Sequence, residues 1–334
     1  MPGGVYVDIV SVVILNWNRR NDLREGLIRL REQSYQPLEI IVVDNGSTDD
    51  SVEMVKRDFP EVHVIETGEN LGVEAYNRGF LHATGEYIVI LDDDSFPAVD
   101  AIGKMVEQFR RDPQLGVVAF DVRSYGQFEE WQRKRHEDIS KTTQAKISKS
   151  LQEKLSVPEC DMSNKEKLST SASDDTEPVE YYMSFNGAGA GIRRELLNRV
   201  GGYPGEFFLY MNETDLAFRI WNAGYKIKFF PDIVAYHKAS PTNRQSWRAP
   251  LYYTRNLFWL VWKHQPAPYV FTLTFQLLYY CFYFAMEQKA SVYLKAAWAA
   301  FRQMGMILEL RKPVQDHVAR NMRVPYRVNF TFYR

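Results

Sequence analysis

The first half of the chain alternates between short apolar runs and segments whose apolar positions recur with helical spacing. The runs at 10–15, 39–43, 62–65, 87–91 and 115–120 are predicted to be β-strands. Helices are predicted between them at 23–30, around Val52 and Val55, at 75–83 and at 101–109. This alternation predicts an α/β fold, a mainly parallel sheet flanked by helices on both faces.

A polar segment then interrupts the pattern. Residues 127–179 are rich in Lys, Glu, Ser, Asp and Thr, and 163–177 have almost no apolar residues. We interpret the segment as an insertion, helical at 139–155 and otherwise a solvated loop, with binding of an acceptor as the alternative. Strands are expected again at 225–230 and 233–236.

The last hundred residues are aromatic, basic and mainly helical in pattern. We therefore predict a catalytic domain at 1–240 and a helical C-terminal extension at 241–334. The stretch 269–286 is apolar and aromatic but slightly short for a membrane span of about 20 residues. Its composition suits an interfacial helix on a membrane surface, but a helix packed on the catalytic domain or at a homodimer interface is slightly preferred.

Charge and cysteine content exclude several classes. The 334 residues hold 41 Lys and Arg against 42 Asp and Glu, so overall charge does not favour nucleic acid as a partner. Two cysteines, Cys160 and Cys281, are too few for a disulfide framework. The amino terminus lacks a basic region followed by an apolar core, so we expect no signal peptide. A cytoplasmic protein is expected, peripheral at the membrane at most.

Three carboxylates follow the strand at 87–91. Asp92, Asp93 and Asp94 repel one another, and a divalent cation such as Mg²⁺ or Mn²⁺ would relieve this repulsion, since oxygen ligands suit both ions. A solvated acidic turn is the alternative. His237 ends a later strand and is a candidate metal ligand, although a lone histidine is more often structural.

Other polar residues stand at neighbouring strand ends, where ligands bind in such sheets. Asn16 and Asp44 end two strands, and the carboxylate of Asp44 is suited to accept a hydrogen bond from a nucleobase. Because Gly72 has no side chain, the backbone at this position can approach a ligand closely. Further candidates for binding the nucleotide are Asn18, Asn70 and Asn77.

An acidic helix start supplies the candidate base. Asn212, Glu213, Thr214 and Asp215 follow an aromatic run, and Glu213 is the candidate general base. Asp215 is interpreted as a cap or orienting residue, with the base role as its alternative. Plain acidity at a helix N-terminus explains the same residues without catalysis.

Together these segments resemble the inverting glycosyltransferases of family 2, which have the GT-A fold. The resemblance covers roughly residues 9–240 apart from the insertion. It rests on VVILNWNR (12–19), VVDNGSTDDS (42–51), NLGVEAYNRG (70–79), GEYIVILDDD (85–94) and FFLYMNETDLAFR (207–219). The 70–79 segment is most similar to transferases of bacterial cell-surface polysaccharides, including rhamnosyltransferases.

The resemblance implies specific roles. Asp44 would match the residue that binds the donor's base, and Asp92 and Asp94 the DXD pair that meets the diphosphate and its metal. Glu213 would match the catalytic base, and His237 a metal-binding histidine of some members. Two positions depart: Asn212-Glu213 stands where Glu-Asp is frequent, so the base could instead be Asp215, and Tyr76 stands where many members have Arg.

The expected reaction is transfer of a sugar from a nucleoside diphosphate sugar to a hydroxyl of a saccharide or lipid-linked saccharide, with Mn²⁺ or Mg²⁺. A sugar-phosphate nucleotidyltransferase is an alternative, but its glycine-rich loop after the first strand is missing at 16–20. A non-catalytic sugar-binding module would lack the candidate base. A dinucleotide-binding oxidoreductase is disfavoured because GxGxxG is absent after the first strand.

Overall fold

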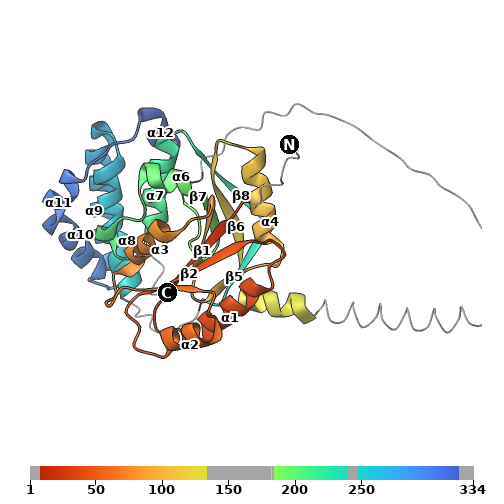
Figure 1. Ribbon diagram of the computed structural model, residues 1–334. Helices are drawn as coiled ribbons and strands as arrows, with labels where there is room; N and C mark the ends of the chain where they lie inside the picture. The colour runs from red at the N-terminus through yellow and green to blue at the C-terminus, as the bar shows by residue number, and fades with distance from the viewer. Residues whose placement is uncertain (1–7, 134–181, 183, 240–246, 323–334) are drawn as a thin grey trace, which may run out of the picture. The chain divides into compact units, whose positions relative to one another are not determined.

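The computed structural model describes residues 8–133, 182, 184–239 and 247–322. The helix predicted at 139–155, like most of the polar insertion, lies outside the described residues. The chain forms two compact units, Ser124–Glu180 and the remainder, Met1–Arg123 with Tyr181–Arg334. The sheet and the C-terminal helices therefore belong to the same unit (Figure 1).

The larger unit is built on an eight-stranded sheet of order β3-β2-β1-β4-β7-β6-β8-β5. Its strands are β1 Val10–Asn16, β2 Leu38–Asp44, β3 His63–Glu66, β4 Tyr87–Asp92, β5 Ser95–Pro97, β6 Leu115–Ser124, β7 Ala190–Arg193 and β8 Lys226–His237. The pairs β1–β2, β1–β4 and β2–β3 are parallel. The pairs β4–β7, β6–β7 and β5–β8 are antiparallel, so the predicted parallel arrangement is confined to the first strands and the sheet is mixed.

One strand replaces the two predicted at 225–230 and 233–236. β8 continues through Pro231, and β5 pairs only with its last three residues, 235–237. Pro231 therefore has no partner strand on the side of β8 that faces β5. A residue without a backbone N–H is tolerated at such a sheet edge. The same pairing sets Ser95 opposite His237, which brings the end of β8 beside the turn that follows β4.

Helices cover both faces of the sheet because the strands bury alternate residues on opposite sides. In the larger unit, before the C-terminal helices, they are α1 Arg20–Arg31, α2 Ser51–Asp58, η1 Gly72–Ala75, α3 Tyr76–His82, α4 Ala101–Arg111, α6 Arg194–Val200, η2 Gly205–Phe207 and α7 Asn212–Asn222. Val12 and Val42 join the core cluster under α1, α2 and α4. Val13 and Val43 join the cluster that includes α3, α6 and α7.

The C-terminal helices extend this second cluster. They are α8 Arg248–His264, α9 Ala267–Glu287, α10 Val292–Arg302, α11 Met304–Glu309 and α12 Asp316–Asn321, and Figure 1 shows them gathered beside α7. Residues 256–264 of α8 are all buried, and Trp259 is among the largest fully buried side chains. In α9 only Leu277 and Cys281 are buried. By length and composition α9 is the one helix among the described residues able to cross a membrane.

Candidate active site

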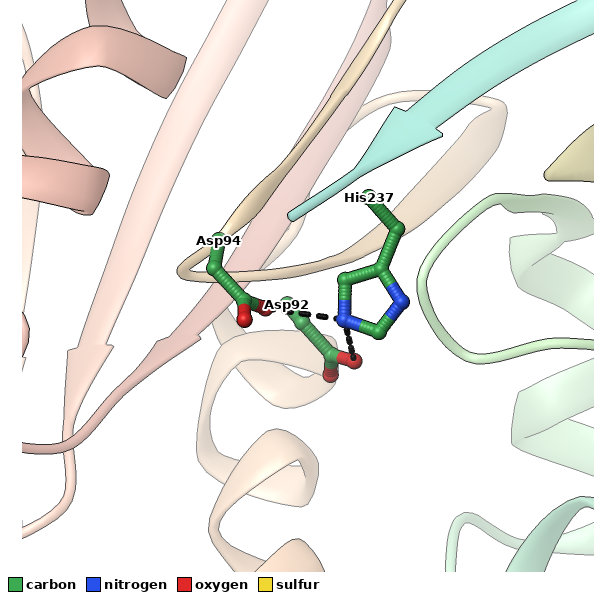
Figure 2. A group of neighbouring side chains, drawn as sticks. All are labelled: Asp92, Asp94 and His237. Carbon is green, nitrogen blue, oxygen red and sulfur yellow. Dashed lines mark ion pairs between the residues drawn. The ribbon is translucent and has the colours of Figure 1, made fainter. Parts of the chain in front are cut away.

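Asp92, Asp94 and His237 meet at the carboxyl end of the sheet, as Figure 2 shows. The His237 Nε2 atom lies 3.0 Å from Asp94 Oδ1 and 3.9 Å from Asp92 Oδ2. One ligand atom from each residue lies within 4.8 Å of the others. Two carboxylates and one imidazole form a donor set that fits Mn²⁺ or Mg²⁺. The structure thus brings together the three residues that the sequence suggested as metal ligands.

Arg19 neutralises part of the acidic turn, a contact that sequence reasoning missed. Its guanidinium lies 2.9 Å from Asp93 Oδ1 and 2.8 Å from Asp94 Oδ2. The Trp17 backbone N–H also donates to Asp93 Oδ2 at 3.0 Å. Burial nevertheless raises the pKa of Asp93 to about 7, and Arg19 opposes this shift. Its position in the sequence, as a basic residue in the loop after the first strand, could have indicated this contact.

Tyr76 contacts the metal-site carboxylate directly. Its hydroxyl lies 2.7 Å from the Leu91 carbonyl oxygen and 3.0 Å from Asp92 Oδ1. Burial raises the pKa of Tyr76 well above its usual range, so the hydroxyl stays protonated and acts as a donor. A tyrosine at this position therefore orients Asp92 from the protein interior.

The polar residues at the ends of β1 and β2 form a connected network. Asn16 Nδ2 donates to Asp44 Oδ1 at 2.8 Å, and the Ser47 backbone N–H donates to Asp44 Oδ2 at 2.9 Å. The Asn18 backbone N–H donates to Ser47 Oγ at 3.0 Å. The structure brings these expected nucleotide-binding residues together. Asn16, Asn18 and Asp44 do not line the cavity described below.

Two residues of the 70–79 segment make close contacts within the protein. Gly72 has φ +66°, and an added Cβ would lie 2.1 Å from the Phe208 carbonyl oxygen. Gly72 therefore lies close to the backbone of Phe208, and its approach to a ligand stays a prediction. Asn77 donates to the Tyr203 carbonyl oxygen at 2.9 Å and accepts from the Tyr203 N–H at 2.8 Å, so it clamps a turn. Asn70 and Gly72 line the cavity; Asn77 does not.

Glu213 lies in the first turn of α7 and lines the same cavity as Asp92 and His237. The cavity has a volume of about 880 Å³, and its lining includes Trp17, Asp92, His237, Asn212 and Glu213. A Cβ at Gly187 would lie 2.8 Å from Glu213 Oε1, so glycine leaves room for the carboxylate. Burial, with a smaller contribution from the charge of Asp92, raises the pKa of Glu213 to about 7. The carboxylate can therefore take up a proton near neutral pH.

Asp215 is buried in an ion network instead of capping the helix. Its Oδ1 lies 2.7 Å from His264 Nε2 and 2.8 Å from Lys263 Nζ, and its Oδ2 lies 2.6 Å from the Arg219 guanidinium. Burial opposes ionisation, yet the charges of His264, Arg219 and Lys263 hold the pKa of Asp215 well below its usual range. Asp215 makes no side-chain cap to α7. Such a carboxylate is a poor proton acceptor.

A strained loop precedes Glu213. Phe208, Tyr210 and Met211 have φ of +62°, +66° and +65°, values that cost energy for residues other than glycine. Asn256 of α8 holds the loop: its Nδ2 lies 3.1, 2.8 and 2.9 Å from the carbonyl oxygens of residues 207, 209 and 210. Residues 208–210 line the cavity. Helix α8 thus shapes the wall beside the candidate base.

Asn212 carries an unused carboxamide at the same wall. It is 1% exposed, and neither its Oδ1 nor its Nδ2 has a hydrogen-bond partner among the described residues. An unsatisfied buried polar group costs stability, so native structures retain such groups mainly where a ligand or function uses them. Its position beside Glu213 in the cavity lining makes a ligand group the natural partner.

Comparisons with known proteins agree with this arrangement. The sequence model of "Glycosyl transferase family 2" matches residues 11–169. The "Uncharacterized glycosyltransferase YfnE" of Bacillus subtilis is 27% identical over 263 residues, which cover 71% of this chain and 66% of YfnE. The "Poly-beta-1,6-N-acetyl-D-glucosamine synthase" of Staphylococcus aureus is 27% identical over 117 residues, 34% of this chain and 28% of the synthase. The chain thus spans less than two thirds of either relative.

A solved structure supports the fold. The mannosyltransferase PcManGT from Pyrobaculum calidifontis, in complex with GDP-Man and Mn²⁺, aligns with a TM-score of 0.55 and 22% identity over 98% of this chain and 85% of its own. The mixed sheet, the helices on its two faces and the clustered DDD turn have the arrangement expected of a GT-A fold. Residues 11–169 therefore match glycosyl transferase family 2, and the chain has a GT-A-like fold.

Proposed function

We propose that the protein transfers a sugar, with inversion, from a nucleoside diphosphate sugar to a hydroxyl of a saccharide or lipid-linked saccharide. The observation that carries the proposal is one cavity whose lining includes Asp92 and His237, two members of the cluster with Asp94, together with Glu213. Production of a polysaccharide or glycoconjugate is supported by the likeness to the Staphylococcus aureus synthase. A GDP-linked donor is supported by the likeness to PcManGT, which was solved in complex with GDP-Man.

The metal-site residues serve the leaving group in this mechanism. Asp92, Asp94 and His237 would hold Mn²⁺ or Mg²⁺, which supplies Lewis-acid stabilisation of the diphosphate charge. Arg19 pairs with Asp93 and Asp94, so the acidic turn does not repel the incoming diphosphate with its full charge. Tyr76 fixes the orientation of Asp92.

Glu213 serves the nucleophile. Its carboxylate takes the proton from the acceptor hydroxyl while that oxygen forms a bond to the anomeric carbon and the bond to the diphosphate breaks. Attack from the face opposite the leaving group gives inversion. The carboxamide of Asn212 then offers one donor and one acceptor to the acceptor sugar, which would satisfy both of its unpartnered atoms.

Asp215 is the less suitable base. Its oxygens are occupied by His264, Lys263 and Arg219, and its lowered pKa leaves it ionised but weakly basic. We propose that Asp215 positions α7 and, with it, Glu213. The cytoplasmic location expected from the sequence stays a prediction.

Thermal shift with UDP-, TDP- and GDP-sugars, each with and without Mn²⁺, tests the donor part of the proposal. A ligand at 100 times its Kd stabilises the folded state by about 2.7 kcal/mol. We expect one nucleotide sugar to raise the Tm by several degrees and Mn²⁺ to increase the effect. If no nucleotide raises the Tm, the proposal is wrong.

The nucleotidyltransferase alternative makes a different prediction. Such an enzyme would release pyrophosphate from a nucleoside triphosphate and a sugar phosphate. Here Arg19, the basic group of the loop after β1, is engaged by Asp93 and Asp94, which disfavours a triphosphate-binding loop. Pyrophosphate release without hydrolysis or transfer of a nucleotide sugar would favour the alternative.

A further inference from the structure

The exposed apolar side chains are concentrated on three C-terminal helices. Of the 20 large hydrophobic residues that are exposed in the described chain, 13 lie between residues 269 and 310. We call these thirteen the α9–α11 surface: Tyr269, Phe271, Phe275, Tyr279, Phe282, Tyr283, Met286, Leu294, Trp298, Phe301, Met306, Leu308 and Leu310. Large hydrophobic side chains exposed in such a concentration mark an interaction site rather than ordinary surface.

The stripe on α9 has a definite orientation. Phe271, Phe275, Tyr279, Phe282 and Met286 recur every three or four residues, so they share one face of the helix. At 1.5 Å per residue this stripe is about 22 Å long. The two buried residues of α9, 277 and 281, lie on the opposite face and belong to the core cluster with α8 and α10. One side of α9 is therefore held by protein along its length.

The charge around this surface suits an anionic partner. Residues 267–312 contain five basic side chains and two acidic ones, whereas the whole chain has a net charge of −1. On α10, Lys295 and Arg302 directly follow Leu294 and Phe301, and the Arg302 guanidinium lies 5.4 Å from the Trp298 ring centroid. Exposed Phe, Tyr and Trp bordered by Lys and Arg are typical of helices that lie in a lipid interface.

We propose that the α9–α11 surface docks on an anionic lipid bilayer, with α9 lying along the interface rather than crossing it. A spanning helix needs lipid or other membrane-embedded segments on all sides, yet α9 packs on α8 and α10, and α10 carries the exposed charges of Lys295 and Arg302. This inference does not rest on the proposed reaction, because lipid binding is measured without any sugar.

Flotation of the full chain with phosphatidylglycerol-containing vesicles tests the proposal. We expect co-flotation that weakens in high salt and is greatly reduced with pure phosphatidylcholine. The double variant Phe275→Ser/Trp298→Ser, at positions that are 70% and 65% exposed, should lower the bound fraction at least tenfold. Lys295→Glu/Arg302→Glu should weaken binding at low salt by more than tenfold, since each basic residue near such a surface contributes about fivefold.

Leu81→Ser is the matched control. Leu81 is 77% exposed but lies on α3, outside the α9–α11 surface, so the variant should float like the wild type. Retention of the wild type on vesicles after alkaline carbonate treatment would show a spanning helix and overturn the interfacial placement. Absence of flotation would overturn the proposal. A dimer seen by light scattering and disrupted by Phe275→Ser/Trp298→Ser would also overturn it, because a second copy of the chain would then occupy the α9–α11 surface.

Discussion

The Nε2 atom of His264, in α8, lies 2.7 Å from Oδ1 of Asp215, in α7. Both side chains are almost fully buried, and the His264 ring stacks on Phe218 of α7 at 5.2 Å between centroids. This contact joins the C-terminal helices to the helix that begins with the candidate base. The carboxylate two residues after Glu213 is therefore part of the framework between α7 and α8.

Removing the Asp215 charge should destabilise the protein. Asp215→Asn removes the negative charge that compensates the basic groups of Lys263, His264 and Arg219. Removing one partner of a buried ion pair costs about 3–5 kcal/mol of folding stability. Because the folded-state pKa of Asp215 is lowered, its contribution is present above the unfolded pKa and is lost only in strong acid. Denaturant unfolding at pH 7 measures the loss. A variant as stable as the wild type but without activity would instead make Asp215 the base.

Glu213→Gln should keep donor binding and lower turnover by about 10² to 10⁴, the usual effect of losing a general base. Since the pKa of Glu213 is raised to about 7, wild-type turnover should increase with pH through this region as the carboxylate deprotonates. The variant should lack this limb of the pH–rate profile. Nearly wild-type turnover in Glu213→Gln would contradict the assignment.

Glu213→Gln should stabilise the protein above neutral pH, whereas Asp215→Asn should destabilise it. A raised folded-state pKa means that the folded state binds the Glu213 proton more tightly, so the group's contribution falls as pH rises from its unfolded pKa to about 7. At pH 8 the charged, half-buried carboxylate is unfavourable. We expect Glu213→Gln to raise the Tm at pH 8 and to change it little at pH 4.

The metal site predicts a dependence on divalent cations. Asp94→Asn should abolish turnover that depends on Mn²⁺ or Mg²⁺ while the protein remains folded, because Asp94 supplies one of the three clustered ligand groups. Activity assays in EDTA and in Mn²⁺, with circular dichroism as the folding control, measure this. Equal wild-type activity in EDTA and in Mn²⁺ would exclude a metal-dependent reaction.

Tyr76→Phe should increase the Mn²⁺ concentration needed for half-maximal activity by about tenfold, because groups that orient metal ligands have effects of this size. Tyr203→Phe is the control: its buried hydroxyl has no hydrogen-bond partner among the described residues, and its ring packs edge-on against Tyr76. The control should leave the Mn²⁺ requirement unchanged. An equal shift in both variants would assign the effect to packing rather than to the hydrogen bond to Asp92.

Asn212→Leu should separate stability from function. Because the carboxamide of Asn212 is unsatisfied, an apolar side chain of similar size should leave the Tm unchanged or raise it, while the KM for the acceptor increases. Asn256→Leu, which removes three contacts to the strained loop, should lower the Tm. Loss of stability in Asn212→Leu with an unchanged acceptor KM would make Asn212 structural.

The strand-end residues were predictable because their positions follow from local pattern. The run at 87–91 ends at Asp92, and the apolar strand before His237 ends at that residue, so β-sheet geometry alone puts both near the same edge. The motif order along the chain then predicted the family and the GT-A-like fold. A mainly parallel sheet was predicted, since strand–helix alternation does not reveal that β7 runs antiparallel to β4 and β6.

Contacts between distant segments could not be predicted in this way. Nothing in the sequence near Asp215 indicates that residues about fifty positions later, Lys263 and His264, compensate its charge. Gly72 and Asn77 were interpreted as ligand-binding because glycine and asparagine serve turns and ligands alike. Only the approach of Phe208 to Gly72 and of Tyr203 to Asn77 distinguishes the two uses.

The strained loop at 208–211 limits how this enzyme can be recombined with its relatives. The family match ends at residue 169, whereas the loop and its support from Asn256 come later in the chain. A chimera that exchanges the C-terminal helices would also exchange Asn256, whose side chain contacts the carbonyl oxygens of residues 207, 209 and 210 beside three residues of positive φ. The cavity wall beside Glu213 therefore depends on a side chain of α8, and successful transplants should retain Asn256.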